Sequence, residues 1–140
     1  MKIDVKAINK QDWRTLAVGA HLAVFNETWT PDRERIDFAL LTVDEENKMI
    51  MYATIREMDS QSAYIQYGGS FPDYRGSVHS IDSFRAILKW LFDHYVNVSF
   101  FTENTNWAML KFAIREKFRV ICTRTFDGHV MLEHYKKREG

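Results

Sequence analysis

The alternation of apolar and polar residues predicts a short strand followed by an amphipathic helix. Residues 2–7 alternate between apolar and mostly charged positions, whereas apolar residues between Trp13 and Val24 recur at helical spacing. Asn9 is a residue type that caps a helix N-terminus, which places the start of the helix directly after the strand. The helical pattern breaks over 26–33, so a loop is expected there.

The middle of the chain predicts three antiparallel strands. Residues 38–43 and 49–55 flank a polar turn and read as a hairpin, and a third strand covers 63–67. Three residues after that strand are expected to end its regular pairing: Gly68, Gly69 and Pro72.

The second half of the chain predicts two helices, a central strand and a closing hairpin. A stripe of apolar residues marks a helix over 81–95, and the apolar segment 96–101 follows as a central strand. Asn106 is expected to cap the next helix. Strands at 120–125 and 130–135 flank an Asp-Gly pair, which favours a tight hairpin turn. This order of elements indicates an α+β fold.

Length and composition fit one packed domain over residues 1–140. The hydrophobic content of 46% is enough to build a core in a chain of 140 residues. No segment approaches the roughly 20 apolar residues that cross a bilayer, and the N-terminus lacks the apolar core of a signal peptide. A cytoplasmic protein without membrane contact is therefore expected.

Charge, cysteine and histidine content exclude several classes of site. Nineteen basic and nineteen acidic residues give a net charge of zero, whereas a nucleic-acid binder usually carries a basic excess. The single cysteine, Cys122, rules out an internal disulfide and is expected to be a buried thiol within a strand. The five histidines lack the spacing of a metal site, so none is expected.

The segment between the third strand and its helix carries the most specific motif. It reads Phe-Pro-Asp-Tyr-Arg-Gly-Ser-Val-His-Ser over 71–80. This segment resembles the signature of the GNAT acetyltransferases, whose pattern is Gln/Arg-x-x-Gly-x-Gly/Ala. Arg75 takes the first position, Val78 that of the first glycine, and Ser80 that of the last small residue. The resemblance implies the GNAT fold, a mixed central sheet flanked by helices.

A second segment resembles the same family. Asn106 and Phe118 match the asparagine that starts a helix and the phenylalanine twelve residues on that ends the family's stretch. Lys117 stands where the family usually has glycine. Ala113 stands where many members have a tyrosine that protonates the departing CoA thiolate.

The resemblance implies acetyl-CoA as co-substrate. Backbone N–H groups at a helix N-terminus would bind its pyrophosphate, while the strand segment before the signature would pair with the pantetheine arm. Val78 crowds the approach to this loop and resists positive φ. The residues expected to contact acetyl-CoA are Gly69, Ser70, Phe71, Arg75, Gly76, Ser77, Val78, His79, Ser80 and Asn106.

Catalytic residues and the acceptor are not assigned by the sequence. GNAT members commonly place a carboxylate on the strand before the signature, and 63–67 contains none. Glu57, Asp59 and Glu103 are the nearest carboxylates, and each reads first as a surface charge. Trp29 lies in the loop that borders the acceptor site in this family, where it would shape a pocket.

Two functions follow from the resemblance. The first is an acetyl-CoA-dependent N-acetyltransferase that acts on an unknown amine by direct transfer, with a homodimer through the closing hairpin as a further expectation. The alternative is a catalytically inactive binding or structural protein of the GNAT fold, similar to certain virion components of tailed bacteriophages. The departures at Val78, Ala113 and Lys117 favour the alternative, whereas Arg75 and Asn106 favour the enzyme.

Overall fold

The chain forms one mixed sheet with helices on both faces. A computed structural model describes residues 2–25 and 35–139. Trp29 lies outside the described residues. The elements of the described part are β1 (Asp4–Asn9), α1 (Lys10–Phe25), β2 (Phe38–Val43), β3 (Met49–Asp59), β4 (Ser62–Ser70), the 3₁₀ turn η1 (Pro72–Tyr74), α2 (Val78–His94), β5 (Asn97–Glu103), α3 (Trp107–Arg115), β6 (Arg119–Phe126) and β7 (His129–Lys137).

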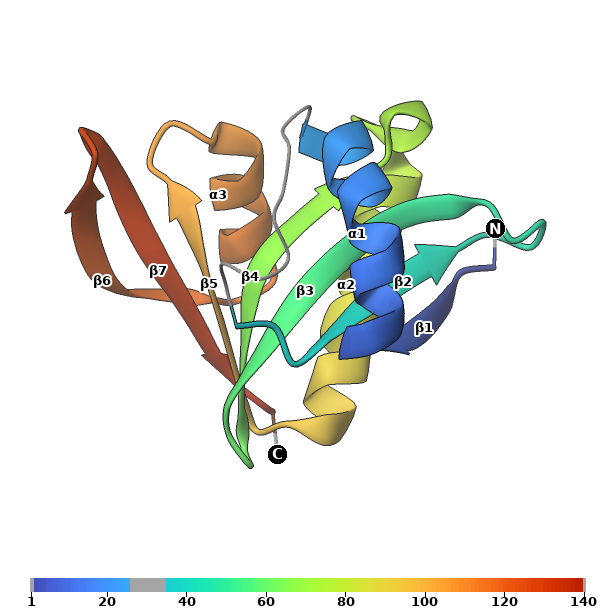
Figure 1. Cartoon of the computed structure of the whole chain (residues 1–140). Coiled ribbons are helices and arrows are strands. Elements are labelled where there is room, and N and C mark those ends of the chain that lie inside the picture. The colour runs from blue at the N-terminus through green and yellow to red at the C-terminus, as the bar shows by residue number, and fades with distance from the viewer. Residues whose placement is uncertain (1, 26–34, 140) are drawn as a thin grey trace.

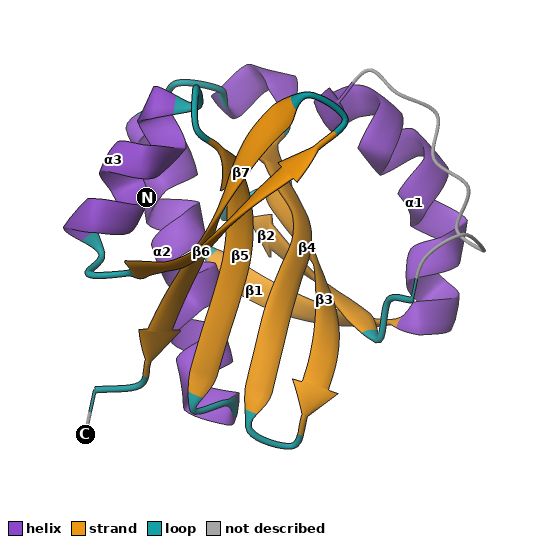
Figure 2. Ribbon diagram, turned by 90° about the vertical axis from the view of Figure 1, so that its left-hand side faces the viewer, coloured by secondary structure: helices purple, strands orange, loops and turns teal. Residues whose placement is uncertain are grey.

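The strand order is β1-β2-β3-β4-β5-β7-β6, and among these described strands only the central pair β4–β5 is parallel. Helix α1 covers one face of the sheet, and α2 and α3 cover the other (Figure 2). The parallel pair arises because α2 carries the chain back across the sheet between β4 and β5. The α+β class expected from the element order is confirmed.

Each face of the sheet buries its own apolar cluster. On the α1 face, Trp13 and Ala17 pack with Tyr52 and Phe71. On the opposite face, α2 and α3 bury a larger cluster that includes Phe84, Ile87, Leu91, Phe100 and Phe112. The stripe predicted for 81–95 is therefore the buried side of α2, as its periodicity indicates.

Local signals in the sequence set the helix ends. The side chain of Asn9 accepts a hydrogen bond from the backbone N–H of Asp12 at 2.8 Å, and that of Asn106 accepts from Met109 at 3.3 Å. Both predicted caps are confirmed. Two residues after the end of α3, Lys117 has φ 65°, a conformation that glycine usually supplies.

The expected end of strand pairing after residue 67 is wrong. Strand β4 continues to Ser70, and Gly68 and Gly69 pair with Ala53 and Tyr52 of β3. Of the three expected breakers, only Pro72 ends regular structure, by starting η1. The two glycines stay extended because the neighbouring strand β3 supplies hydrogen-bond partners for their backbone groups.

Cys122 is half-buried, so the expected buried thiol is also wrong. It lies in β6, the last strand of the sheet, whose other residues are all exposed. Apolar residues predicted a strand correctly here, but an edge strand without a covering helix leaves its side chains in solvent.

Candidate functional site

The sheet opens between its two central strands. Parallel pairing joins Ser62–Ile65 of β4 to Asn97–Phe100 of β5 and ends there. Beyond this point the strands run apart, as Figure 1 shows for the ends nearer the top of the view. The backbone of β4 after Ile65 therefore has pairing with β3 on one side, while its other edge faces the opening.

The signature loop follows β4 and is fastened to the β2–β3 turn. The Tyr74 hydroxyl donates to the Asp44 carboxylate at 2.7 Å, and Lys48 forms an ion pair of 2.8 Å with Asp73. The backbone N–H of Lys48 and the Tyr74 hydroxyl hold the pKa of Asp44 below its ordinary value. These contacts fix the loop where it leads into α2.

Helix α2 begins immediately after a glycine turn. Gly76 has φ 69°, and an added Cβ there would meet nothing within 4 Å. Ser77 is the N-cap: its hydroxyl donates to the Tyr74 carbonyl at 2.6 Å and accepts from the N–H of Ser80 at 3.4 Å. A helix leaves its first N–H groups without intrahelical acceptors, so this end attracts anions.

Val78 does not carry the backbone strain that the sequence suggested. It is the first residue of α2 and is not among the residues with positive φ in the described part of the chain. Its side chain is 63% exposed. The position in this loop that needs a left-handed conformation is Gly76, where the chain has a glycine.

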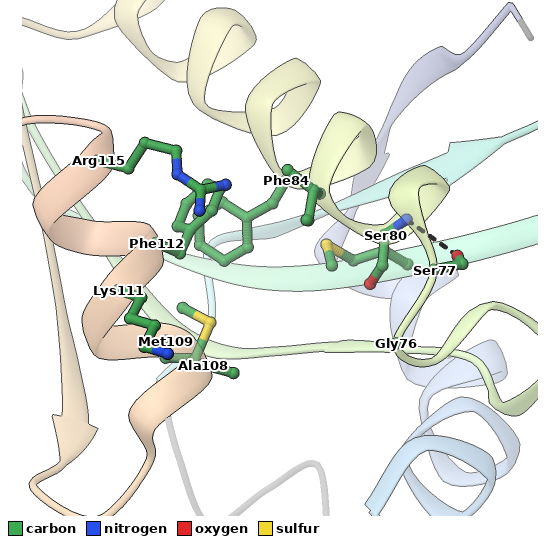
Figure 3. A pocket seen from close by; sticks show the side chains of 11 residues that line it. Gly76, Ser77, Ser80, Phe84, Ala108, Met109, Lys111, Phe112 and Arg115 are labelled. Carbon is green, nitrogen blue, oxygen red and sulfur yellow. Dashed lines mark hydrogen bonds between the residues drawn. The ribbon is translucent and has the colours of Figure 1, made fainter.

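A hollow of about 390 Å³ lies between the start of α2 and helix α3. Figure 3 shows the side chains of Lys111 and Arg115 on α3, across from Ser77 and Ser80. The full lining is Met51, Gly76, Ser77, Ser80, Ile81, Phe84, Ala108, Met109, Lys111, Phe112 and Arg115. The hollow thus combines an apolar floor with a helix N-terminus and two cations, which suits a ligand with an apolar arm and an anionic group.

The side chain of Arg75 does not line this hollow but reaches the end of α1. Its guanidinium donates to the carbonyl of Ala23 at 3.1 Å and to that of Val24. These carbonyls belong to the last turn of α1, which carries no basic residue of its own. A cation at a helix C-terminus is stabilising, so in this structure Arg75 joins the signature loop to α1.

Four other predicted contact residues also have structural partners. The N–H of Phe71 donates to the Ile50 carbonyl at 2.8 Å, and its ring is buried beside Tyr52. The hydroxyls of Ser70 and Ser80 bond to each other and join the end of β4 to α2. His79 is half-buried with its ring 6.0 Å from that of Tyr74.

Gly69 faces α1. A Cβ at this position would lie 2.4 Å from Cγ1 of Val24, closer than real contacts allow. The structure therefore gives this glycine a packing reason that is independent of any ligand. Of the ten predicted contact residues, it brings Gly76, Ser77 and Ser80 together in the hollow.

A second, narrower hollow of about 170 Å³ occupies the opening between β4 and β5. It shares Phe84 and Met109 with the first hollow, so the two are adjacent. Its lining comprises Ile65, Gln66, Gly68, Phe84, Phe100, Phe101, Thr102, Glu103, Asn106 and Met109. Asn106, predicted to contact acetyl-CoA, lies here while its side chain also caps α3.

Of the three carboxylates considered as bases, Glu103 alone lines this hollow. Its Oε1 lies 2.5 Å from Nδ1 of His129. Glu57 accepts from the Tyr95 hydroxyl at 2.7 Å, and Asp59 accepts from the backbone N–H of Gln61. These last two lie at the β3–β4 hairpin, at the opposite end of β4 from the opening.

Two features of these hollows were not predicted from the sequence. One is the presence of two cations on α3, and the other is a hydrogen-bonded pair at the second hollow, formed by Thr102 and His134. Ala108, Lys111, Phe112 and Arg115 follow the i, i+3, i+4, i+7 spacing of one helix face, and this signal could have found the two cations. Thr102 and His134 gave no local signal, because they meet only when β5 pairs with β7.

The part of the chain that the structure describes contains neither a cluster of metal ligands nor a membrane-spanning helix. No group of three histidine, cysteine or acidic side chains there lies close enough to hold a metal ion. No described helix is long and apolar enough to cross a membrane.

Comparison with solved structures identifies the fold. The chain is similar to the ribosomal-protein-S18-alanine N-acetyltransferase from Escherichia coli, with a TM-score of 0.77, 12% identity, and coverage of 99% of this chain and 96% of that one. Mutant forms of the spermidine/spermine N-acetyltransferase SpeG from Vibrio cholerae give a TM-score of 0.75 at 11% identity, covering 98% and 95%. The IAA acetyltransferase from Bacillus cereus gives 0.71 at 11%, covering 97% and 99%.

Sequence comparison finds no such neighbours. No protein-family model matches the chain, and no curated protein matches it. The structural likeness extends over almost the whole of each chain, and the GNAT fold expected from the two motifs is confirmed.

Proposed function

We propose that residues 1–140 act as one domain that transfers an acyl group from acyl-CoA, with acetyl-CoA as the expected donor, directly to the nitrogen of an amine. One observation carries the proposal: the hollow between α2 and α3 joins an anion-attracting helix N-terminus and two cations to the opening between β4 and β5. The structural neighbours support the reaction class, since two of those compared are N-acetyltransferases and the third is an acetyltransferase.

The anionic part of the donor would bind at the start of α2. The N–H groups of Val78 and His79 open this helix, and Gly76 leaves room for a phosphate beside the backbone. Lys111 and Arg115 would add positive charge from α3. Arg75 supports this arrangement indirectly by holding the loop against α1.

The acyl end would lie in the opening of the sheet. The adjacent hollows give a continuous path from the helix N-terminus past Phe84 and Met109. An amine held beside the thioester there would react faster because both groups are positioned together. Glu103 lines this opening and contacts His129, and its carboxylate would take the proton of the amine.

The expectations about location and self-association stay predictions. A cytoplasmic site of action fits a substrate of the CoA type. In a homodimer, a second copy would cover the edge strand β6, where Val120, Ile121 and Phe126 are exposed.

Calorimetric titration with CoA tests the proposal. We expect a dissociation constant in the micromolar range or weaker, a value that Lys111→Ala and Arg115→Ala each raise by roughly fivefold, the size of one charged contact near a surface. Lys89→Ala is the matched control, because this exposed lysine of α2 pairs with Asp93 and does not line the hollow. We expect its affinity to equal that of the wild type.

Val78→Gly separates the enzyme from the structural alternative. The smaller residue would keep or increase CoA affinity in an acyltransferase, because it removes an exposed side chain from the start of α2. Binding should be followed by release of free thiol when acetyl-CoA and amines are supplied. Absence of both heat and thermal shift with millimolar CoA, in the wild type and in this variant, would favour the inactive structural protein.

A further inference from the structure

A buried polar pair lies behind the opening between β4 and β5. The Thr102 hydroxyl of β5 is 2.7 Å from Nε2 of His134 on β7, and their side chains are 5% and 2% exposed. The imidazole stacks on Phe100, with ring centres 5.1 Å apart. Thr102 also lines the narrow hollow, so one residue both contacts a buried histidine and borders a space that a ligand could enter.

The histidine can set the direction of the threonine hydroxyl. Burial lowers the pKa of His134, which keeps the imidazole neutral near pH 7. A neutral imidazole with its proton on Nε2 donates to Thr102 Oγ1, and the hydroxyl proton of Thr102 is then free to point away from His134. Thr102 borders the hollow, where a bound ligand would offer that proton an acceptor.

The surroundings of the hydroxyl would strengthen such a hydrogen bond. Phe84, Phe100 and Met109 line the same hollow and limit access of water. Ala113 has no hydroxyl to offer at the position where the related family often has a tyrosine that protonates the leaving sulfur. Ala113 of α3 offers no such donor, whereas β5 presents the hydroxyl of Thr102 at the hollow's lining.

We propose that Thr102 is a catalytic residue that donates a hydrogen bond to the sulfur of the acyl carrier, and that His134 is the positioning residue that orients it. This inference rests on the proposed acyl transfer. The amine nitrogen bonds to the thioester carbonyl carbon, the carbon–sulfur bond breaks, and its electron pair stays on sulfur. The thiolate leaves while hydrogen-bonded to Thr102 Oγ1, and the proton lost by nitrogen passes to the Glu103 carboxylate.

The test compares two ligands that differ only in the sulfur. CoA and desulfo-CoA, in which hydrogen replaces the thiol, are titrated at pH 9, where a larger fraction of the thiol is ionised than at pH 7 and the thiolate resembles the leaving group. We expect the wild type to bind CoA about tenfold more tightly than desulfo-CoA, as for a hydrogen bond to a charged acceptor. Thr102→Val should bring this ratio close to one while leaving desulfo-CoA affinity within about twofold.

Two further variants separate a role at the sulfur from a role in packing. Thr102→Ser keeps the hydroxyl and should keep most of the ratio. His134→Phe keeps the stacked ring, removes the hydrogen-bond donor and should reduce the ratio, which gives a second reading if Thr102→Val does not fold. A merely structural pair would weaken both ligands equally.

Each result decides between distinct conclusions. Equal affinity of the wild type for CoA and desulfo-CoA, or an unchanged ratio in folded Thr102→Val, would overturn the role of Thr102 while leaving CoA binding intact. Failure of the wild type to bind either ligand would instead remove the proposed function, and this inference with it.

Discussion

Gly68 and Gly69 are neighbours in β4, yet their missing side chains have opposite surroundings. A Cβ at Gly68 would make ordinary contacts, the nearest being 3.7 Å from Cγ2 of Ile65. A Cβ at Gly69 would overlap with Val24, a β-branched residue with little rotamer freedom in a helix. The two positions therefore differ in what an alanine would cost.

We expect Gly69→Ala to lower the free energy of unfolding by about 1–3 kcal/mol, the usual cost of overpacking, because α1 must move away from the sheet. Gly68→Ala is the matched control and should change stability little or raise it slightly, since alanine loses less backbone entropy on folding. Urea unfolding followed by circular dichroism measures both. Equal effects of the two substitutions would contradict the packing role of Gly69.

Individual roles in the signature loop were the least predictable feature of the sequence. The motif placed Arg75 and Ser80 correctly at the start of α2, because the order of residue types is local information. The partner of Arg75 is the end of α1, about 50 residues earlier in the chain, and nothing near Arg75 in the sequence encodes that contact. Position in a motif therefore predicted the location of the side chain better than its direction.

Helix ends show how local signals both succeed and mislead. The N–H of Phe118 bonds to the Ala113 carbonyl and that of Lys117 to the Ile114 carbonyl, which is the pattern of a Schellman ending. Lys117 occupies the left-handed position at φ 65°. The glycine that the family usually has at this site would adopt the left-handed conformation without strain. Lys117 adds local backbone strain here but leaves the fold intact.

We expect Lys117→Gly to raise the free energy of unfolding by about 0.5–1 kcal/mol. Relief of the left-handed conformation contributes about 1–2 kcal/mol, and the greater freedom of glycine in the unfolded chain offsets part of it. Thermal and urea unfolding measure the gain. Lys89→Gly makes the same chemical change inside α2 and should lower stability by about 1 kcal/mol. A loss of stability at both positions would count against the Schellman interpretation.

The helices and strands were predicted well from the sequence, whereas the order of the strands within the sheet was predicted less well. Caps, hairpin turns and apolar stripes depend on residues a few positions apart, so the order of helices and strands could be derived from the sequence. Strand β7 pairs with β5 and separates it from β6, and this insertion depends on packing across the whole sheet. The pairing of Thr102 with His134 and the shape of the narrow hollow follow from it, which explains why neither was foreseen.

At the scale of the whole molecule, the buried histidine of β7 gives the fold a pH dependence. Burial lowers the pKa of His134 in the folded protein below its ordinary value of 6.5. Well above pH 6.5 the His134 side chain is neutral in both folded and unfolded chains. It then adds no slope to the dependence of the free energy of unfolding on pH. As the pH falls below 6.5, the unfolded chain takes up the proton first, and the folded state loses stability.

The free energy of unfolding from urea titrations should therefore fall between pH 7.5 and 5.5, with His134 contributing a slope of at most about 1.4 kcal/mol per pH unit. His134→Gln should be less stable at pH 7.5 but should show a flatter decline. His94→Gln is the matched control, because His94 is exposed and lies at the end of α2, and it should decline as the wild type does. If His134→Gln declines as steeply as the wild type, the loss of stability in acid arises from other groups, and His134 does not stay neutral in the folded protein.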